Sequence, residues 1–254
     1  MSSTKTYGRL GNQFFINVAA SLLAEKHNLY IQYENYDSVN VLFPLFIGTN
    51  KYTETVIVND SNFVDIYNKE SIDFNILIEH CYLQSKWVTD LTHLYVQSKM
   101  PLIEKRNPYN HNNNCFIHVR LGDVAWFNPG AAYYEKILST LSVNKIYLST
   151  DSKEHPIVQK LLQNPKIELY ETSVINTILF ASTIRHLILS HGTFSGTIAY
   201  LGVHSDVYFI KETPETSWDY FNGNGMFDIF KDKTTKRGPF KEMDKVLLLC
   251  ESQV

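Results

Sequence analysis

Cysteine, long apolar runs and net charge are all scarce in this sequence, and each scarcity argues against a class of protein. The three cysteines, Cys81, Cys115 and Cys250, lie far apart without a Cys-x-x-Cys pair, so neither a disulfide framework nor a cysteine zinc site is expected. This pattern fits a reducing compartment. A net charge of −3 provides no basic excess, which argues against a nucleic-acid-binding protein.

Membrane and leader segments are also missing. No apolar run approaches the roughly 18 residues of a spanning helix, and residues 1–7 are too polar for a signal peptide. A hydrophobic fraction of 44% with 13% aromatic residues is enough for a core, and 254 residues correspond to one or two domains. We therefore expect a soluble, cytoplasmic, folded protein with no nucleic-acid partner and no membrane span.

Several catalytic motifs do not occur. There is no Gly-x-x-x-x-Gly-Lys-Ser/Thr of a P-loop kinase, no Gly-x-Ser-x-Gly elbow and no His-Glu-x-x-His. A generic Rossmann oxidoreductase or methyltransferase fits poorly, because no strand is followed by Gly-x-Gly-x-x-Gly. Asp-x-Asp is absent as well, so cationic side chains would have to neutralise a diphosphate in place of a bridging metal. We expect neither a metal nor a cofactor.

The chain after residue 114 alternates apolar strands with helices. We expect strands at 115–119, 145–149, 167–170, 186–190 and 207–210, and helices at 131–141, 154–162, 173–183 and 196–203. Strands joined by crossover helices form a parallel sheet covered on both faces, which predicts a doubly wound α/β domain. Such a sheet binds ligands beyond the carboxyl ends of its strands, where the strand order reverses.

The chain before residue 107 has a weaker pattern. Apolar residues at three- and four-residue spacing after Gly11 predict a helix. The other expected elements are a strand at 29–32, β-like runs at 41–47 and 55–58, and a helix that Thr89 or Asp90 caps and Pro101 closes. The Asn-rich residues 106–114 are the best linker candidate. We predict an N-terminal lobe of residues 1–106 and a C-terminal lobe of residues 107–254, with a tail able to pack back on the first lobe.

Three polar clusters fall where such sheets bind ligands. Gly8-Arg-Leu-Gly-Asn-Gln13 precedes the first helix, and its glycines permit either an anion-binding turn or a plain capping turn. His118-Val-Arg-Leu-Gly-Asp123 ends the first strand of the second half. The third cluster, residues 190–200, runs from a strand end into a helix. Its hydroxyl residues either cap that helix or, with backbone N–H groups, bind a phosphate.

Arg120 is the strongest single candidate. Side chains alternate along a strand, so His118 and Arg120 share one face while Val119 points the other way. A guanidinium at a strand end offers forked donors to phosphate oxygens. The alternatives are an ion pair of Arg120 with Asp123 and a buried, backbone-bonded His118. Asp151, at the end of the next strand, would bind a base or a ribose, or cap a helix.

The ordered motifs resemble those of the α-1,2-fucosyltransferases, within the wider group that includes the α-1,6- and protein O-fucosyltransferases. The matching segments are 8–13 with the two phenylalanines that follow, 118–123, 149–151 and 193–200. The resemblance implies an α/β fold of the GT-B type, in which two Rossmann-like lobes hold the donor in a cleft between them. It also implies metal-independent, inverting transfer of L-fucose from GDP-β-L-fucose to a hydroxyl of a glycan acceptor, forming an α-1,2 linkage.

The resemblance assigns roles to residues of this chain. It places Arg120 on the diphosphate, where it stabilises the charge of the departing GDP, and Thr193 and Ser195 on the β-phosphate, with Phe194 as a further donor-binding residue. His118 and Asp151 would help to hold the guanosine. The fucose and acceptor side would be lined by Gly8, Arg9, Gly11, Asn12 and Gln13. Independently of the resemblance, Asp123 is our candidate general base, with His118 as the alternative and a structural Asp123 left open.

Two departures from the family pattern leave other functions open. Leu121 stands where the family commonly has a second arginine, and the polar residues 1–7 make the strand before the glycine turn short. The alternatives are another GDP- or UDP-linked donor, or a non-catalytic relative that binds a nucleotide or a glycan. The aromatic segment Trp218-Asp-Tyr-Phe221 would either stack on a sugar or pack where the tail crosses back between the lobes.

Overall fold

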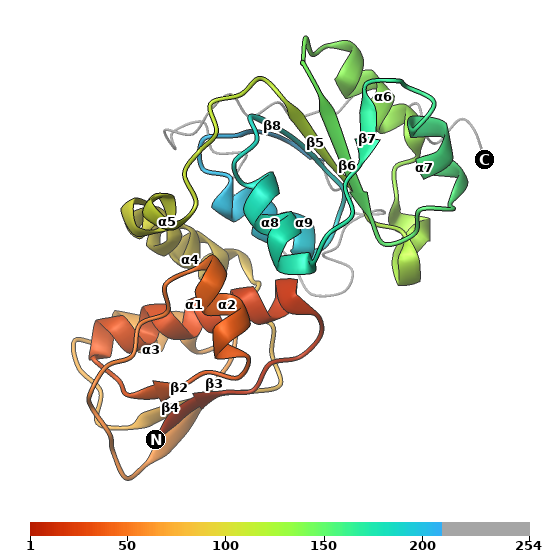
Figure 1. The fold of residues 1–254 in the computed structure, drawn as a ribbon. Helices are drawn as coiled ribbons and strands as arrows, with labels where there is room; N and C mark the ends of the chain where they lie inside the picture. Colours follow the sequence, from red (N-terminus) through yellow and green to blue (C-terminus); the bar gives the residue numbers. More distant parts are fainter. Residues whose placement is uncertain (210–254) are drawn as a thin grey trace. The chain divides into compact units, whose positions relative to one another are not determined.

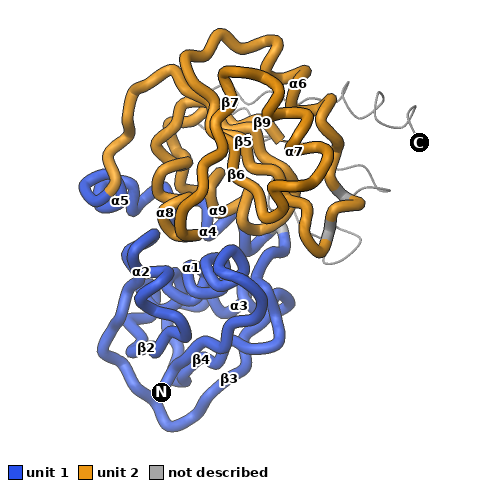
Figure 2. Tube along the Cα trace, turned by 45° about the vertical axis from the view of Figure 1, so that its right-hand side comes forward, with its two compact units in different colours: residues 1–106, 222–229 blue, residues 107–221, 230–254 orange. Residues whose placement is uncertain are grey.

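The computed structural model describes residues 1–209. Helices and strands alternate along this part of the chain, except that α5 follows α4 and α6 follows the 3₁₀ helix η1 without a strand between them (Figure 1). It divides into two compact units: unit 1 contains residues 1–106, and unit 2 contains the described residues from 107 onward (Figure 2). Each unit has its own parallel β-sheet.

Unit 2 contains a five-stranded parallel sheet in the order β7-β6-β5-β8-β9. Its strands are β5 Cys115–Val119, β6 Ile146–Thr150, β7 Ile167–Leu169, β8 His186–Leu189 and β9 Asp206–Tyr208. Its helices are α6 Ala131–Ser139, α7 Pro156–Leu161, α8 Val174–Ala181 and α9 Thr193–Leu201, with a 3₁₀ helix, η1, at Gly122–Phe127. The strand order reverses between β5 and β8, so this is the edge at which a doubly wound sheet binds its ligand.

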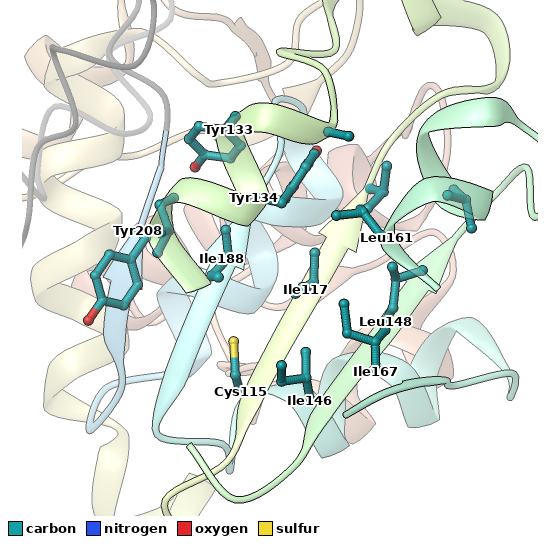
Figure 3. Packing of buried hydrophobic residues seen from close by; sticks show 14 of the residues in the cluster. Cys115, Ile117, Tyr133, Tyr134, Ile146, Leu148, Leu161, Ile167, Ile188 and Tyr208 are labelled. Atoms are coloured by element: carbon teal, nitrogen blue, oxygen red, sulfur yellow. The ribbon is translucent and has the colours of Figure 1, made fainter. Parts of the chain in front are cut away.

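Alternation along β5 separates the core from the site. The apolar cluster between the sheet and helices α6 and α7 takes every second residue of this strand, Cys115, Ile117 and Val119 (Figure 3). Phe116 and His118 face the opposite layer, where the Phe116 ring packs against Phe180 of α8 with centroids 6.3 Å apart. The predicted opposition of His118 and Val119 is therefore confirmed.

The doubly wound sheet predicted for the second half is confirmed, but one helix boundary was wrong. The helix expected at 196–203 begins at Thr193, because Gly192, with φ +96°, is its N-cap residue. Because α9 begins at Thr193, both Thr193 and Ser195 lie inside its first turn, and no side-chain hydroxyl of the described residues caps the helix. This shift brings the free N–H groups of the helix closer to the strand end than the sequence suggested.

Unit 1 contains a four-stranded parallel sheet in the order β2-β1-β4-β3. Its strands are β1 Ser2–Thr4, β2 Ile31–Gln32, β3 Thr55–Val58 and β4 Asn75–Ile78. Its helices are α1 Leu10–His27, α2 Tyr36–Leu42, α3 Phe63–Asn68, α4 Lys86–Ser98 and α5 Met100–Arg106. The order reverses between β1 and β4, where the glycine turn leaves β1.

The inner strand β1 is short and polar, as predicted from residues 1–7. Ser2 and Thr4 are buried, with exposures of 0% and 4%. Ser2 Oγ accepts a hydrogen bond from the Ile76 N–H (3.0 Å), and Thr4 Oγ1 donates to Asn17 Oδ1 of α1 (2.8 Å). Side-chain hydrogen bonds therefore satisfy the polar groups of a strand that contributes little apolar surface.

The weak pattern of residues 33–85 led to one wrong element and to three missed elements, the helices α2 and α3 and the strand β4. The β-like run at 41–47 is not a strand, since its first residues end α2 and residues 43–49 have no regular structure. Pro44 lacks the N–H that a ladder requires. The strand β4 was not predicted, although Ile76-Leu-Ile78 is an apolar run that could have indicated it. The run at 55–58 is β3, as expected.

The helix before the linker also starts earlier than predicted. Neither Thr89 nor Asp90 caps it, because α4 begins at Lys86 and its N-cap residue is Ser85. Pro101 lies in the first turn of α5, where a missing N–H costs nothing.

Within residues 1–209, no helix is both long and apolar enough to cross a lipid bilayer. The aromatic residues at 218–221 and the rest of the C-terminal tail lie outside the described part of the chain.

Candidate active site

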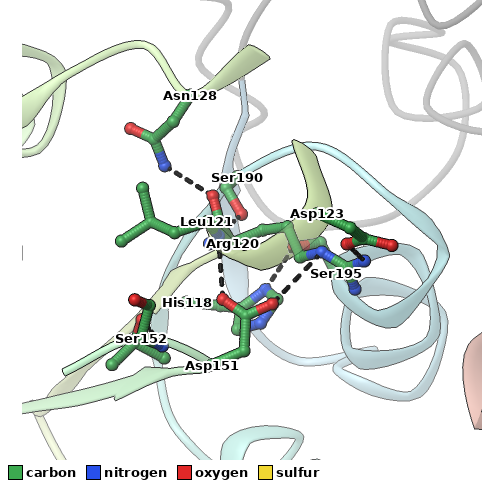
Figure 4. A network of polar contacts seen from close by, with 10 residues as sticks. His118, Arg120, Leu121, Asp123, Asn128, Asp151, Ser152, Ser190 and Ser195 are labelled. Atoms are coloured by element: carbon green, nitrogen blue, oxygen red, sulfur yellow. Dashed lines mark hydrogen bonds and ion pairs between the residues drawn. The ribbon is translucent and has the colours of Figure 1, made fainter. Parts of the chain in front are cut away.

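Three loops at the carboxyl edge of the unit 2 sheet meet around Arg120 (Figure 4). Arg120 follows β5, Asp151 follows β6 and Ser190 follows β8. The Arg120 N–H donates to Ser190 Oγ (2.9 Å), and the Leu121 N–H donates to Asp151 Oδ1 (2.8 Å). The ends of three strands are therefore tied together where the strand order reverses.

The Arg120 guanidinium contacts two carboxylates. Its Nη2 donates to Asp123 Oδ1, and its Nε lies 3.4 Å from Asp151 Oδ2. The side chain is 19% exposed, and Nε is buried without a hydrogen-bond partner in the described structure. Because Nε faces Asp151, a bound anion would be met by the terminal N–H groups of the guanidinium.

Asp151 also shapes the loop that follows Arg120. Gly122 has φ +26°, and a Cβ atom at this position would lie 2.6 Å from Asp151 Oδ2, so the close approach requires glycine. Leu121 is fully buried in the apolar cluster of unit 2. The position at which the resembled family commonly has a second arginine therefore belongs to the core in this chain.

His118 is a buried histidine held against α9. It is 5% exposed, its Nδ1 lies 2.7 Å from Ser195 Oγ, and its ring packs on Phe194 with centroids 4.8 Å apart. Burial, followed by the charges of Arg120 and His191, lowers the pKa of His118 to about 3. The imidazole is therefore neutral near pH 7 and fastens the first turn of α9 to β5.

The N-terminus of α9 presents backbone N–H groups at the same edge. The first hydrogen bond of the helix runs from Gly196 N to Gly192 O (3.0 Å), so the N–H groups of Thr193, Phe194 and Ser195 have no partner within the helix. The Ser195 side chain is fully buried and its hydroxyl is already bonded. An anion at this helix end would meet backbone donors rather than the Ser195 hydroxyl that the sequence suggested.

The sequence did not indicate how closely other groups surround Arg120. Asn128 Nδ2 donates to the Arg120 carbonyl (2.9 Å) and to the Tyr134 hydroxyl (3.1 Å), which fixes the strand end from the α6 side. Burial and the charge of Arg120 lower the pKa of His191 to about 4. His191 was visible as part of the motif at 190–200, whereas no pattern pointed to Asn128.

Unit 1 holds the other predicted residues, in the turn between β1 and α1. Gly8 has φ +74°, and a Cβ atom there would collide with the Asn12 amide. Gln13 Nε2 donates to the Gly8 carbonyl (3.1 Å), and Arg9 is the exposed N-cap residue of α1. Gly11 lies buried inside α1, so the tight turn expected from two glycines is formed by Gly8 alone.

A loop that the sequence did not single out contacts this turn. It follows β4, and we call residues 79–85 the β4 loop. Gln84 Nε2 donates to Asn12 Oδ1 (3.2 Å), and the His80 ring stacks on Tyr7 with centroids 5.7 Å apart. The polar residues of unit 1 thus also gather where its strand order reverses, between β1 and β4.

Within residues 1–209, no group of three or more His, Cys, Asp or Glu side chains is arranged to hold a metal ion. The donor set at the unit 2 edge consists of one guanidinium and the N–H groups of a helix N-terminus. This is the chemistry of an anion site, and a diphosphate is an anion that both kinds of donor bind well.

No protein-family model matches the sequence, and no curated protein matches it. Solved structures do match. A FUT1 variant from Arabidopsis thaliana in complex with GDP has a TM-score of 0.50 at 11% identity, over 85% of this chain and 71% of that one. The fucosyltransferase NodZ from Bradyrhizobium has a TM-score of 0.50 at 9% identity, over 81% of this chain and 94% of NodZ. The fold is GT-B. The two parallel, Rossmann-like sheets of units 1 and 2 are the two sheets of that GT-B fold.

Proposed function

We propose that this chain is a glycosyltransferase that moves L-fucose from GDP-β-L-fucose to a hydroxyl of a glycan acceptor. We further propose that transfer inverts the anomeric centre, needs no metal ion and forms an α-1,2 linkage. The motifs that resemble the α-1,2-fucosyltransferases support this, as does the fold shared with FUT1, which was solved with GDP, and with the fucosyltransferase NodZ.

The observation that carries the proposal is the placement of Arg120. Its partly buried guanidinium lies at the strand-order reversal of unit 2, on the same sheet edge as the N-terminus of α9, and its Nε has no hydrogen-bond partner among the described residues. A diphosphate at this edge would accept hydrogen bonds from the guanidinium and from the N–H groups of Thr193, Phe194 and Ser195. No other arginine of the described chain lies at a carboxyl strand end of this sheet.

The proposed chemistry needs these donors to be in place before the reaction. As fucose leaves the donor, the sugar gains oxocarbenium character and the diphosphate gains negative charge. Donors that are already fixed stabilise such charge without reorganising, and losing one typically costs about 10²–10³ in rate. We propose that Asp151 and His118, which the family resemblance assigns to the guanosine, act as positioning residues. Asp151 holds the Arg120 loop, and His118 holds the first turn of α9.

Asp123 is the proposed general base, and its contact with Arg120 suggests how it becomes available. Its side chain is 60% exposed and accepts a hydrogen bond from the Arg120 guanidinium. A bound diphosphate would compete for that guanidinium and release the carboxylate. Asp123→Asn should then lower kcat by about 10²–10⁴, while the affinity for GDP stays the same or increases. An unchanged kcat would leave Asp123 with a structural role only.

The function is tested by measuring GDP release from GDP-fucose against an array of glycan acceptors, with and without EDTA. We expect acceptor-dependent release of GDP that EDTA does not abolish. NMR of the product should show that the transferred fucose is α-1,2-linked. Release with another nucleotide sugar but not with GDP-fucose would overturn the donor assignment. Loss of activity in EDTA that Mg²⁺ or Mn²⁺ restores would overturn metal independence.

A second function is favoured by one specific observation. Leu121 fills a core position, so the second cation of the family pattern is missing at that place. A chain with reduced charge stabilisation could bind GDP without transferring fucose. Tight GDP binding together with no release across the acceptor array would favour this non-catalytic, nucleotide-binding function.

A further inference from the structure

Unit 1 contains a pocket that no motif indicated. It has a volume of about 430 Å³ and lies between the loop after β3 and the β4 loop, at the carboxyl edge of the unit 1 sheet. That volume is within the range of about 300–1,000 Å³ typical of small-molecule sites. Its lining residues include Asn59, Asp60, Tyr82, Gln84 and Ser85.

The backbone around this pocket is held in an unusual conformation. His80 and Leu83 are not glycines, yet they have φ of +57° and +51°. The Asp60 carboxylate fixes this part of the β4 loop, because it accepts hydrogen bonds from the N–H groups of Ser85 (2.9 Å) and Leu83 (3.1 Å). Left-handed backbone at non-glycine residues is costly and is concentrated at functional sites.

One hydroxyl in the pocket wall has no hydrogen-bond partner within residues 1–209. Ser85 is the N-cap residue of α4, yet its side chain does not cap the helix, and its buried Oγ makes no hydrogen bond in the described structure. A buried polar atom without a partner costs free energy. A rotation of the Ser85 side chain toward the pocket would let a ligand hydroxyl provide the missing hydrogen bond.

The character of the lining indicates a neutral ligand. Its polar groups are amides, hydroxyls, the His80 imidazole, the Cys81 thiol and the Asp60 carboxylate, and no Lys or Arg is among the lining residues that the structure describes. Burial, followed by the charge of Asp60, raises the pKa of Cys81 to about 12, so this thiol stays uncharged. Tyr82 is 36% exposed and offers a ring face with a polar tip. Several hydroxyl partners next to an aromatic face suit a sugar ring better than a phosphate.

We propose that this pocket binds a neutral hexopyranoside, with the Ser85 hydroxyl as a direct hydrogen-bonding partner and the Tyr82 ring as an apolar wall. On the proposed function, which this step presupposes, the bound sugar is the acceptor saccharide. The contact from Gln84 to Asn12 links the pocket to the glycine turn, which is the part of unit 1 expected to line the fucose and acceptor side.

The test uses the full chain and a set of methyl hexopyranosides (glucose, galactose, mannose and N-acetylglucosamine), observed by saturation-transfer difference NMR with and without GDP. We expect at least one glycoside to bind, and Ser85→Ala and Tyr82→Ala each to weaken that binding about three- to tenfold. Ser98→Ala is the matched control, because its hydroxyl donates to the Tyr95 carbonyl at the other end of α4. Circular dichroism and thermal melting confirm that the variants are folded.

Three results would overturn the proposal. The first is that no glycoside binds, with or without GDP, and the second is that Ser85→Ala and Tyr82→Ala both bind the glycoside as tightly as the wild type. The third is that inorganic pyrophosphate displaces the glycoside from the Arg120→Lys variant. That variant separates this proposal from the proposed function. Glycoside binding that persists in Arg120→Lys while GDP binding is lost supports two independent sites. Glycoside binding by a protein that never binds GDP would keep the pocket and refute the fucosyltransferase.

Discussion

At the scale of single residues, the guanidinium of Arg120 differs from a lysine ammonium in its geometry. It directs Nη2 to Asp123 and a buried Nε toward Asp151 at the same time, which a single ammonium cannot reproduce. We predict that Arg120→Lys lowers kcat/KM by about 10²–10³ and weakens GDP binding, while the protein remains folded. Steady-state kinetics and calorimetric titration with GDP measure these two effects.

Arg185 provides the matched control for this substitution. It lies just before β8, at the amino end of the sheet, and its side chain is 54% exposed. Arg185→Lys should leave both kcat/KM and GDP affinity unchanged. Near-normal turnover of Arg120→Lys would refute the role assigned to Arg120.

The buried histidine His118 makes stability depend on pH. Its pKa in the folded protein, about 3, lies below the ordinary value, so the unfolded chain binds the proton more readily between about pH 6.5 and pH 3. The free energy of unfolding should therefore decrease as the pH falls through this range, by up to about 1.4 kcal/mol per pH unit from His118. Urea unfolding at about pH 7 and about pH 5 measures it. His118→Asn should show a shallower dependence, and an equal slope in both proteins would contradict the assignment.

Residue-level prediction from the sequence succeeded where only strand alternation was needed. It placed His118 and Val119 on opposite faces of β5, as the structure does. It did not foresee that Ser195 would be bonded to His118, a residue 77 positions away. Such a contact depends on how α9 packs on the sheet, and no local pattern of the chain encodes that packing.

At the scale of elements, the turn from β5 into η1 depends on a glycine. The carboxylate of Asp151 occupies the space of a Cβ atom at Gly122, whereas a Cβ atom at Gly130 would meet nothing within 4 Å. Both glycines have positive φ, so alanine strains the backbone at either position. We predict that Gly122→Ala also displaces Asp151 and weakens GDP binding, whereas Gly130→Ala affects stability alone. Titration with GDP and thermal melting of both variants distinguish the two effects, and equal GDP affinities would contradict the prediction.

The elements of unit 2 could be predicted because its strands are buried on both faces. A parallel strand such as β5 is then a short continuous apolar run, which is easy to recognise. In unit 1 the inner strand β1 reads Ser-Ser-Thr, and its buried hydroxyl groups form hydrogen bonds with Asn17 and with the β4 backbone. Hydrophobic periodicity carries no information about such a strand, so the first half of the fold remained poorly defined until its tertiary contacts were known.

At the scale of the whole molecule, both sheets concentrate polar groups at their carboxyl edges, but the groups differ in charge. Unit 2 presents Arg120 and the N-terminus of α9, which suit an anion. The pocket of unit 1 presents amides, hydroxyls, an imidazole, a thiol and one carboxylate, and no Lys or Arg among its described lining residues, which suits a neutral ligand. The net charge of −3 does not reveal this difference, because one guanidinium at the carboxyl edge of a sheet is enough for an anion site and hardly changes the charge of the whole chain.

A nucleotide that binds only the folded protein must raise its stability, which makes the donor assignment measurable on the intact chain. At 100 times its Kd, GDP should add about 2.7 kcal/mol, which corresponds to roughly 5–10 °C in Tm at about 2–4 °C per kcal/mol. GDP and UDP share the ribose and the diphosphate, so stabilisation by UDP reports binding of these shared groups and should decrease in Arg120→Lys. The additional stabilisation by GDP reports recognition of guanine. Melting curves that shift equally with UDP and GDP would refute a guanine-specific donor site, and curves that shift with neither nucleotide would refute the nucleotide site itself.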